Sequence, residues 1–298
     1  MYKVLLRLNN LRQVTMSTIS NISKFREELQ RFSNFEAVGL LGILNITPDS
    51  FYDGGKKTST KQAIDSAENM LSNGANIIDI GGQSSRPGAE TIDEKTEWSR
   101  VEPIIKGVLD KNPETFISID TYRAFVADKA LENGAVLVND ISAGKIDPEL
   151  HNVVASHKAP YVLMHMQGTP EDMQNNPSYE DPTAEVLKFF KDQTAHLNSL
   201  GINDIVLDPG FGFGKRISDN YNLLKNLNSF TSLGYPVLAG LSRKSMIYKV
   251  LGGTPSDALN GTTALNAIAL QNGASLLRVH DIAEAKEVIK LQTQLTAS

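Results

Sequence analysis

One stretch of the chain, residues 205–215, places an acid, glycines, aromatic rings and a lysine directly after three aliphatic residues. The aliphatic residues predict a buried strand, which ends at Pro209 because proline has no N–H to donate to a sheet. Asp208 is therefore expected at the carboxyl end of a strand, before glycines that let the backbone approach a ligand closely. Two phenylalanines beside this acid and Lys215 suit a flat ligand that forms hydrogen bonds.

This glycine-rich stretch matches neither common phosphate-binding motif. A Walker A loop needs glycine in place of Pro209 and Ser or Thr in place of Arg216. A dinucleotide fingerprint needs a third glycine at Lys215 or at Ile217. An isolated Asp-Pro-Gly is commonly a simple turn, so its interpretation depends on the rest of the chain.

The composition narrows the class of protein. The chain has 298 residues, of which 41% are hydrophobic, a net charge of −5 and no cysteine, so it can form one large α/β domain or two small ones. The lack of cysteine excludes a disulfide scaffold, and no two of the five histidines have His-x-x-x-His spacing, which argues against zinc. No Lys/Arg tract indicates nucleic-acid binding, and no apolar run has the length of a membrane span. We expect a soluble, cytoplasmic protein without nucleic-acid or membrane partners.

The elements that position these residues follow a repeating pattern after residue 37, in which a short apolar run precedes an amphipathic helical pattern. The eight runs lie at residues 40–46, 77–80, 116–119, 136–138, 161–164, 205–207, 237–241 and 276–279. A glycine that can end a helix stands in the tripeptide Asn-Gly-Ala, which occurs three times between a helix and a strand, at residues 73–75, 133–135 and 272–274. The pattern favours the α/β class and a single (β/α)8 TIM barrel. A doubly wound sheet is the alternative, but the first turn lacks its phosphate fingerprint.

Residues 1–36 differ from this repeat, and we assign them to an N-terminal extension that is partly disordered, with a barrel domain over residues 37–298. A short helical pattern lies around Phe25 to Phe32. The extension lacks the apolar core and small-residue cleavage site of a signal peptide, and Glu27 and Glu28 are unusual for a transit peptide. Met16 offers a second possible start, so we expect residues 1–15 to be dispensable.

Polar residues lie within or directly after almost every predicted strand, towards the end where barrel enzymes carry their sites. They are Asn45, Asp79, Asp120, Asn139, His165, Asp208, Lys244, Arg278 and His280. The acids could hold a metal, yet a carboxylate cage for Mg²⁺ or Ca²⁺ gathers its acids closely, whereas these lie on separate strands. Recognition of a heterocycle is the alternative, because carboxylates accept hydrogen bonds from ring N–H groups and an amide both donates and accepts.

An anion site is expected at the last strand. Arg278 and His280 are two residues apart, so they face the same side of that strand, close to the start of the last helix. Asn45 ends the neighbouring first strand and could coordinate a hard cation, Mg²⁺, that is held mainly by the oxygens of the anion.

Taken in order, these motifs resemble those of the dihydropteroate synthases. The matching pieces are GILNITPDSF at 42–51, DIGGQSSRPG at 79–88, IDT at 119–121, VND at 138–140, MHM at 164–166, DPGFGFGK at 208–215, SRKS at 242–245 and RVHD at 278–281. They span nearly the whole chain after residue 37. Pterin-binding methyltransferase domains share the barrel and some of the acids, so a methyl-transfer partner or a noncatalytic pterin-binding barrel is the rival interpretation.

The resemblance implies a homodimeric transferase of folate biosynthesis, a sulfonamide target, that joins 6-hydroxymethyl-7,8-dihydropterin pyrophosphate to p-aminobenzoate through a pterin cation. It implies a pterin site made of Asp120, Asn139, Met164, Asp208, Lys244 and Arg278. It assigns the pyrophosphate and its Mg²⁺ to Asn45, Arg278 and His280, with Asn45 as the metal ligand. The p-aminobenzoate site it implies consists of Phe51, Ser85, Arg86, Pro87, Phe213, Lys244 and Ser245. The catalytic set it implies is Asn45, Asp120, Asp208, Lys244, Arg278 and His280.

Gln83 is a departure from the family pattern, which usually has glutamate there, and it removes a charge at the base of the second loop. The loops after the first two strands are expected to act as lids that exclude water. We expect ordered binding, in which pyrophosphate and Mg²⁺ create the p-aminobenzoate site. The rival functions do not need Ser85, Arg86, Pro87 or Ser245, which the resemblance places around p-aminobenzoate.

Overall fold

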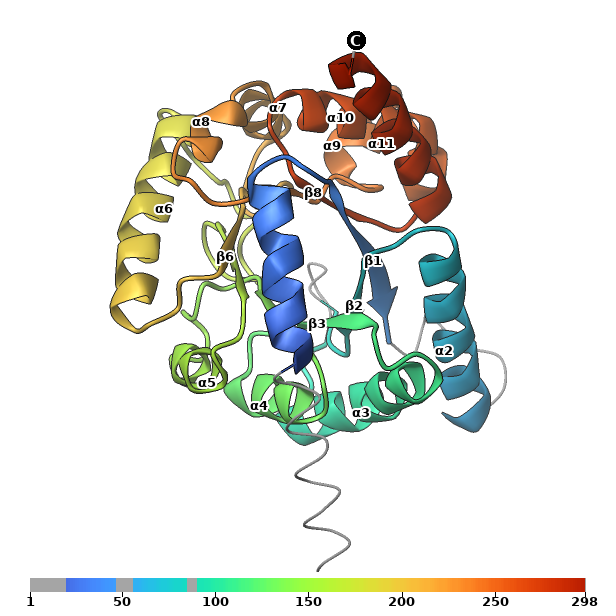
Figure 1. Ribbon diagram of the computed structural model, residues 1–298. Helices are drawn as coiled ribbons and strands as arrows, with labels where there is room; N and C mark the ends of the chain where they lie inside the picture. Colours follow the sequence, from blue (N-terminus) through green and yellow to red (C-terminus); the bar gives the residue numbers. More distant parts are fainter. Residues whose placement is uncertain (1–19, 47–55, 85–89, 298) are drawn as a thin grey trace, which may run out of the picture.

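Eight parallel strands alternate with helices in the computed structural model, which describes residues 20–46, 56–84 and 90–297 (Figure 1). The strands are β1 (Gly39–Asn45), β2 (Ile77–Gly81), β3 (Phe116–Asp120), β4 (Leu137–Asp140), β5 (Tyr161–Met164), β6 (Ile205–Asp208), β7 (Leu238–Ala239) and β8 (Leu276–Val279). They pair in the order β6-β5-β4-β3-β2-β1-β8-β7, and a parallel bridge between Leu207 and Val237 joins the two outer strands. The predicted (β/α)8 barrel is confirmed.

The helices lie outside this barrel and follow the strands in turn (Figure 1). They are α2 (Lys56–Ser72), α3 (Glu94–Lys111), α4 (Ala124–Glu132), α5 (Glu149–His157), α6 (Pro182–Ser199), α7 (Ile217–Lys225), α8 (Asn228–Thr231), α9 (Ser245–Leu251), α10 (Leu259–Gln271) and α11 (Ile282–Ala297), with a 3-10 turn η2 (Pro255–Asp257). The repeated Asn-Gly-Ala junctions end α2, α4 and α10, and their glycines have the positive φ that closes a helix: 102° at Gly74, 104° at Gly134 and 96° at Gly273.

The main hydrophobic core lies between the strands and the surrounding helices. Ile78 and Ile80 of β2 are buried in the same cluster as Ile104 and Ile105 of α3. A sheet covered by helices on its outer face and closed on its inner face buries both sides of each strand, which explains the nearly continuous apolar runs in the sequence.

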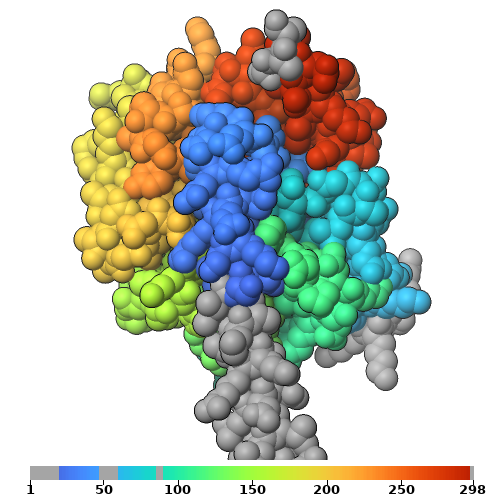
Figure 2. Space-filling view, in the orientation of Figure 1, coloured from blue at the N-terminus to red at the C-terminus, as the bar shows by residue number. Residues whose placement is uncertain are grey.

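A helix over residues 20–33 lies across the amino end of the barrel, as Figures 1 and 2 show. Phe25 and Phe32 are 0% and 1% exposed and join a second core with Leu41, Ile77 and other residues at the starts of the strands. Phe32 lies so close to Gly39 that a Cβ at that glycine would be 2.9 Å from the phenylalanine ring. This packing makes residues 20–33 part of the barrel's compact unit, while the division of the chain at residue 36 stays a prediction.

Polar contacts fix the direction of this helix. Arg26 Nε lies 2.6 Å from Asp204 Oδ2, just before β6, and Asn21 Nδ2 donates to the carbonyl of Pro113, just before β3, at 3.0 Å. Both partners lie in loops that lead into strands, so the helix is tied to the amino end on two sides. In the described part of the chain, no helix combines the length and apolar character needed to cross a membrane.

Candidate active site

The carboxyl ends of four neighbouring strands present polar residues in one row. In the register of β1 to β4, Asn45 lies beside Gly81, Gly81 beside Asp120, and Asp120 beside Asn139. Gly81 leaves open the space between its neighbours, because a Cβ there would lie 3.4 Å from Asn45 Oδ1 and 3.4 Å from Asp120 Cβ. Parallel pairing has therefore brought three of the predicted site residues to one place.

Arg278 of β8 reaches across this row and bridges two carboxylates. Its Nε lies 2.6 Å from Asp79 Oδ2 and its Nη2 2.6 Å from Asp120 Oδ2. Asn139 Nδ2 donates to the same Asp79 oxygen at 3.0 Å, whereas Asp79 Oδ1 is buried without a hydrogen-bond partner among the described residues. Burial raises the pKa of Asp120 to about 7, although Arg278 opposes the shift.

Asp208 occupies the end of β6, as predicted, and its carboxylate is buried. Oδ1 accepts a hydrogen bond from the Gly210 N–H at 2.7 Å. Burial raises the pKa of Asp208, although the charge of Lys244 lowers it. Gly240 keeps this side of the mouth open, because a Cβ there would lie 3.6 Å from Lys244 Nζ and 3.9 Å from both Asp208 Oδ2 and Arg278 Cβ. These three side chains therefore converge on one space.

Lys244 stands directly before α9 and points back into the mouth. Its Nζ donates to the carbonyl of Phe211 and lies 4.8 Å from the centre of the Phe213 ring, a cation–π arrangement. Burial lowers the pKa of Lys244 to about 8. Ser245, the first residue of α9, is half-buried beside it.

An apolar surface adjoins Lys244 through Phe213. Met164, at the end of β5, packs in a cluster with Ile141, Met166 and Met173, against which the partly buried Tyr122 and Phe213 rest. Methionines and aromatic rings can pack on the face of a flat ring system, while the nearby carboxylates can accept hydrogen bonds from its edge.

His280 follows β8 and is oriented by Ser242. The Ser242 Oγ lies 3.0 Å from His280 Nδ1 and accepts from the His280 backbone N–H at 3.2 Å. Because Ser242 accepts from this N–H, its own hydroxyl hydrogen can donate to Nδ1, which leaves the proton of a neutral ring on Nε2. The neighbouring Arg243 instead forms a two-point ion pair with Asp281, at 3.0 and 2.6 Å.

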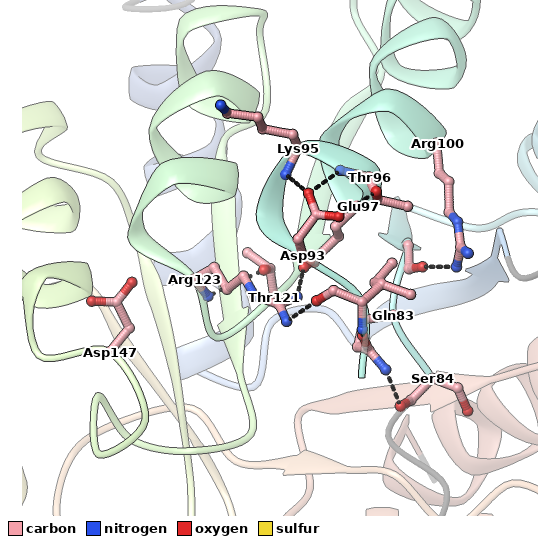
Figure 3. Close-up of polar contacts among 12 residues, drawn as sticks. Gln83, Ser84, Asp93, Lys95, Thr96, Glu97, Arg100, Thr121, Arg123 and Asp147 are labelled. Carbon is pink, nitrogen blue, oxygen red and sulfur yellow. Dashed lines mark hydrogen bonds and ion pairs between the residues drawn. The ribbon is translucent and has the colours of Figure 1, made fainter. Parts of the chain in front are cut away.

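Gln83 lies at the base of the second loop and ties its two ends together (Figure 3). Its Nε2 donates to the carbonyls of Ser84 and Glu90, both at 3.0 Å, and its Oε1 accepts from the Ile92 N–H at 3.0 Å. A glutamate could accept from Ile92 but could not donate to the two carbonyls. Gln83 therefore uses both the N–H donors and the oxygen acceptor of its amide, which the glutamate of the family pattern does not have together.

An ion pair between Arg123 and the buried Glu97 lies near Gln83 (Figure 3). Arg123 Nη1 contacts the carboxylate of Glu97, which is 0% exposed, and Arg123 Nη2 donates to the carbonyl of Ile92. Burial raises the pKa of Glu97, although its contacts with Thr121 and Arg123 lower it. The pair connects α3, and Ile92 just before it, with the turn after β3.

The structure thus brings together ten sequence-predicted site residues at one end of the barrel: Asn45, Asp120, Asn139, Met164, Asp208, Phe213, Lys244, Ser245, Arg278 and His280. The predictions for Phe51, Ser85, Arg86 and Pro87 lie outside the described residues. Asp79 and Lys215, which the sequence placed among the strand-end acids and in the aromatic loop, are also buried but belong to none of the implied substrate sites. An acid inside the apolar run of β2 was the available signal for Asp79.

A carboxylate cage for a metal is not formed by the described residues, which contain no group of three or more His, Cys, Asp or Glu side chains placed to hold an ion. Asp79 and Asp120 both contact Arg278 instead. Recognition of a hydrogen-bonding ring is the better interpretation of these acids, since carboxylates, an amide and cations surround a partly apolar space.

Comparison with known proteins gives a consistent result. The sequence model of the family described as "Pterin binding enzyme" matches residues 41–280. The dihydropteroate synthase of Synechocystis sp. is 46% identical over 259 residues, which cover 86% of this chain and 89% of that protein. The Escherichia coli protein of the same name is 42% identical over 85% of this chain and 89% of its own length.

Solved structures agree with these sequence relatives. A Yersinia pestis dihydropteroate synthase with a sulfonamide drug complex superposes with a TM-score of 0.83 at 38% identity, covering 88% of this chain and 96% of its own. The Xanthomonas albilineans enzyme with 4-aminobenzoic acid gives 0.82 at 38% identity, covering 88% and 94%.

Proposed function

This chain belongs to the dihydropteroate synthase family of pterin-binding enzymes, and we propose that its strand-end residues join 6-hydroxymethyl-7,8-dihydropterin pyrophosphate to p-aminobenzoate with release of pyrophosphate. The observation that carries the proposal is the convergence of Asp120, Asn139 and Asp208 with Lys244 and Arg278 at one mouth. The two acids accept from the ring N–H and amino groups of the pterin, while Asn139 both donates and accepts.

Arg278 has the capacity for a further contact with substrate. A guanidinium has five N–H donors, and its hydrogen bonds with Asp79 and Asp120 use one at Nε and one at Nη2. A guanidinium can stack its flat face on a ring, and the cluster that contains Met164 is apolar, so we assign the two sides of the pterin ring to Arg278 and Met164. Lys244 would hold the pterin from the side of β7.

The reaction we propose breaks the bond between the pterin methylene carbon and the pyrophosphate oxygen before the new bond forms. The electron pair of that bond leaves with pyrophosphate, whose negative charge faces Arg278 and His280. The methylene cation faces the carboxylates of Asp120 and Asp208, and one such preorganised group supplies about 3 kcal/mol of transition-state stabilisation. The aromatic amine then donates its lone pair to the carbon, and the nitrogen loses a proton to water or pyrophosphate. No protein nucleophile is needed.

Mg²⁺ is proposed as the cofactor, with Asn45 as its protein ligand. Asn45 Oδ1 faces the open space beside Gly81, next to Asp120, and a hard ion with one or two protein oxygens commonly takes its other ligands from substrate phosphates and water. This donor set fits a metal that arrives with pyrophosphate. When bound, it would stabilise the negative charge that develops on the leaving oxygen.

The p-aminobenzoate site is proposed on the far side of Lys244, with Phe213 and Ser245 among the described residues and Phe51, Ser85, Arg86 and Pro87 outside them. The Lys244 ammonium beside the Phe213 ring suits an aromatic carboxylate, because it offers a charge and a stacking surface together. The Xanthomonas albilineans neighbour was solved with 4-aminobenzoic acid and the Yersinia pestis neighbour with a sulfonamide. Sulfonamides should therefore compete with p-aminobenzoate. Inhibition competitive with the pterin substrate would contradict this position for the p-aminobenzoate site.

The decisive test of the function is a direct assay of the purified chain with both substrates and Mg²⁺. We expect dihydropteroate and pyrophosphate in equal amounts, and loss of both in the Asp208→Asn variant. Formation of neither product by a folded wild-type chain would leave the methyl-transfer or noncatalytic interpretation.

Ordered binding is the next part of the proposal, with pyrophosphate and Mg²⁺ preceding p-aminobenzoate. Calorimetry should show p-aminobenzoate binding only when both are present. His280→Ala should weaken this dependent binding while leaving pterin affinity nearly unchanged, because His280 lies beside Ser242 on the anion side and not beside Asp208. Tight binding of p-aminobenzoate to the free protein would rule out the order.

A homodimer is proposed through the surface of α9, α10 and α11, which lie side by side (Figure 1). Val250, Leu251, Ile268 and Leu291 on these helices are exposed, Leu251 and Leu291 by 60% and 69%. Large apolar side chains gathered on adjacent elements mark an interface in many proteins. Light scattering should give twice the chain mass, and Leu291→Glu should lower it, whereas Phe35→Glu at an exposed site before β1 should not.

The cytoplasmic location stays a prediction from composition.

A further inference from the structure

Lys215 is a buried charge that the proposed reaction leaves without a role. Its side chain lies in the loop between β6 and α7 and the residue is 4% exposed. Four acceptor atoms lie around its Nζ: His165 Nδ1 and the His165 carbonyl at 3.1 Å, and the carbonyls of Gly210 and Phe213 at 3.0 Å. Such a site is built for an ammonium group.

Hydrogen-bond counting supports the charged form. An ammonium has three hydrogens to share among the three carbonyl oxygens and His165 Nδ1, whereas a neutral amine has only two hydrogens for the same four acceptors. Burial lowers the pKa of Lys215 to about 7, while the charge of Asp208 raises it. Burial and then Lys215 lower the pKa of His165 to about 2, so the imidazole is neutral and can accept at Nδ1.

The acceptors of Lys215 belong to the loop that carries the aromatic side of the mouth. Phe213 donates its N–H to the carbonyl of Gly210 at 3.0 Å, so Lys215 binds both ends of one turn. The ring of Phe213 then lies 4.8 Å from Lys244 Nζ, and Lys244 binds the carbonyl of Phe211. Lys215 thus contacts the turn whose Phe213 ring lies against Lys244.

The same loop is pressed against the segment after β5, where glycine is required. A Cβ at Gly210 would lie 2.0 Å from the carbonyl oxygen of His165, and one at Gly214 would lie 2.3 Å from that of Gln167. The two segments therefore pack backbone against backbone, and the carbonyls of His165 and Gly210 both accept from Lys215 Nζ. The Lys215 ammonium supplies the donors between His165 and Gly210.

The backbone of Asp208 has an anchor outside this turn, in addition to the hydrogen bond that Asp208 Oδ1 accepts from the Gly210 N–H. It pairs with Met164 in the β5–β6 register, and its carbonyl accepts from the His165 N–H at 3.0 Å. Loss of the Lys215 ammonium should therefore leave Asp208 close to its place while the Phe213 turn shifts.

We propose that Lys215 is a positioning residue for the aromatic-amine side of the site, where its ammonium holds the turn from Gly210 to Phe213 so that the Phe213 ring stays against Lys244. This rests on the proposed function, since it assigns that side to p-aminobenzoate. Lys215 touches no substrate in this scheme.

The test compares Lys215→Met with Lys225→Met, an exposed lysine of α7 that serves as the matched control. Lys215→Met should raise KM for p-aminobenzoate on the order of 10-fold or more, as loss of charged hydrogen bonds predicts, and leave pterin affinity measured by calorimetry within about 2-fold. Lys225→Met should change neither. Equal loss of both affinities would indicate a general structural role, and an unchanged KM would overturn the proposal.

A chemical rescue keeps the test independent of whether Lys215→Met folds. The chain has no cysteine, so the thiol of Lys215→Cys can be alkylated selectively in denaturant with bromoethylamine, which restores an ammonium, or with iodoacetamide, which adds a neutral amide. After refolding alongside wild type, the first product should recover the low KM and the second should not. Equal KM values for the two products would contradict the role of the charge. Absence of activity in wild type would instead count against the proposed function.

Discussion

The two ends of the barrel bury their side chains in opposite ways. At the amino end, Phe25 and Phe32 of the helix over residues 20–33 fill the opening with apolar contacts. At the carboxyl end, the buried groups are ions: Arg278 lies between Asp79 and Asp120, and Lys244 faces Asp208. Both ends bury side chains, but only at the carboxyl end do the buried side chains carry charges, which are costly to remove from water.

This difference suggests that the amino end of the barrel serves stability and the carboxyl end serves function. Apolar burial at the amino end stabilises the fold in proportion to the area covered. Carboxylates whose pKa is raised by burial, as at Asp120 and Asp208, are costly to keep ionised, and Asp79 has one oxygen without a described partner. A protein retains such groups where they bind or react, so substitutions at the two ends should have different consequences.

The largest effect on stability is expected from Phe25→Ala. The residue is fully buried, and removal of a buried phenyl ring lowers the free energy of unfolding by about 3–5 kcal/mol. Urea unfolding measures this, and kcat of the folded fraction should be unchanged. The control is Phe35→Ala, which is 60% exposed and should stay within about 0.5 kcal/mol of wild type. A large fall in kcat with Phe25→Ala would mean that the two ends are not independent.

Asp208→Asn should produce the opposite result. We expect kcat/KM to fall about 10²–10³-fold, as for loss of one preorganised charge, with a free energy of unfolding equal to or above that of wild type, because burial disfavours the carboxylate. Steady-state kinetics and urea unfolding on one preparation test both parts. Asp192→Asn, an exposed acid paired with Lys188, is the control and should change neither value. A marked fall in the free energy of unfolding of Asp208→Asn would show that the charged groups at the carboxyl end also stabilise the fold.

A smaller effect concerns pH. Burial raises the pKa of Asp120 from 3.8 to about 7, so between these values the folded state holds a proton that the unfolded chain has lost. Its contribution to stability is full below about pH 4 and is lost as pH rises through about 7. Asp120→Asn removes this dependence, so the stability of wild type minus that of the variant should fall by about 2–3 kcal/mol between pH 5 and pH 8. An equal difference at both values would show that Arg278 keeps the carboxylate ionised throughout.

The smallest effect is expected from a chain that starts at Met16. It retains the helix over residues 20–33, so its activity should match wild type and its free energy of unfolding should agree within about 0.5 kcal/mol. A chain that starts at Ala37 serves as the comparison and should lose several kcal/mol, because Phe25 and Phe32 are removed. If both truncations behaved alike, the amino-end helix would contribute nothing to stability.

Much of the site could be predicted because it lies at strand ends. Asn45, Asp120 and Asn139 each follow a legible apolar run, and parallel pairing places such positions in one layer. Lys215 was visible as a lysine in a glycine-rich loop but without a role, because its four acceptors come from two segments 50 residues apart. The helix over residues 20–33 was visible as a helical pattern, but nothing local indicated that its phenylalanines close the barrel.

The sequence by itself determined the eight strands, their glycine-ended helices and the edge at which the polar residues gather, because these depend on periodicity and on backbone preferences of neighbouring residues. Tertiary structure alone decided that Arg278 bridges Asp79 and Asp120, partners that are 199 and 158 residues away. Such a bridge depends on the register with which β8 pairs with β1, and on closure of the barrel. Each is set by the packing of all strands together, because a shift by one residue would turn every side chain to the opposite face.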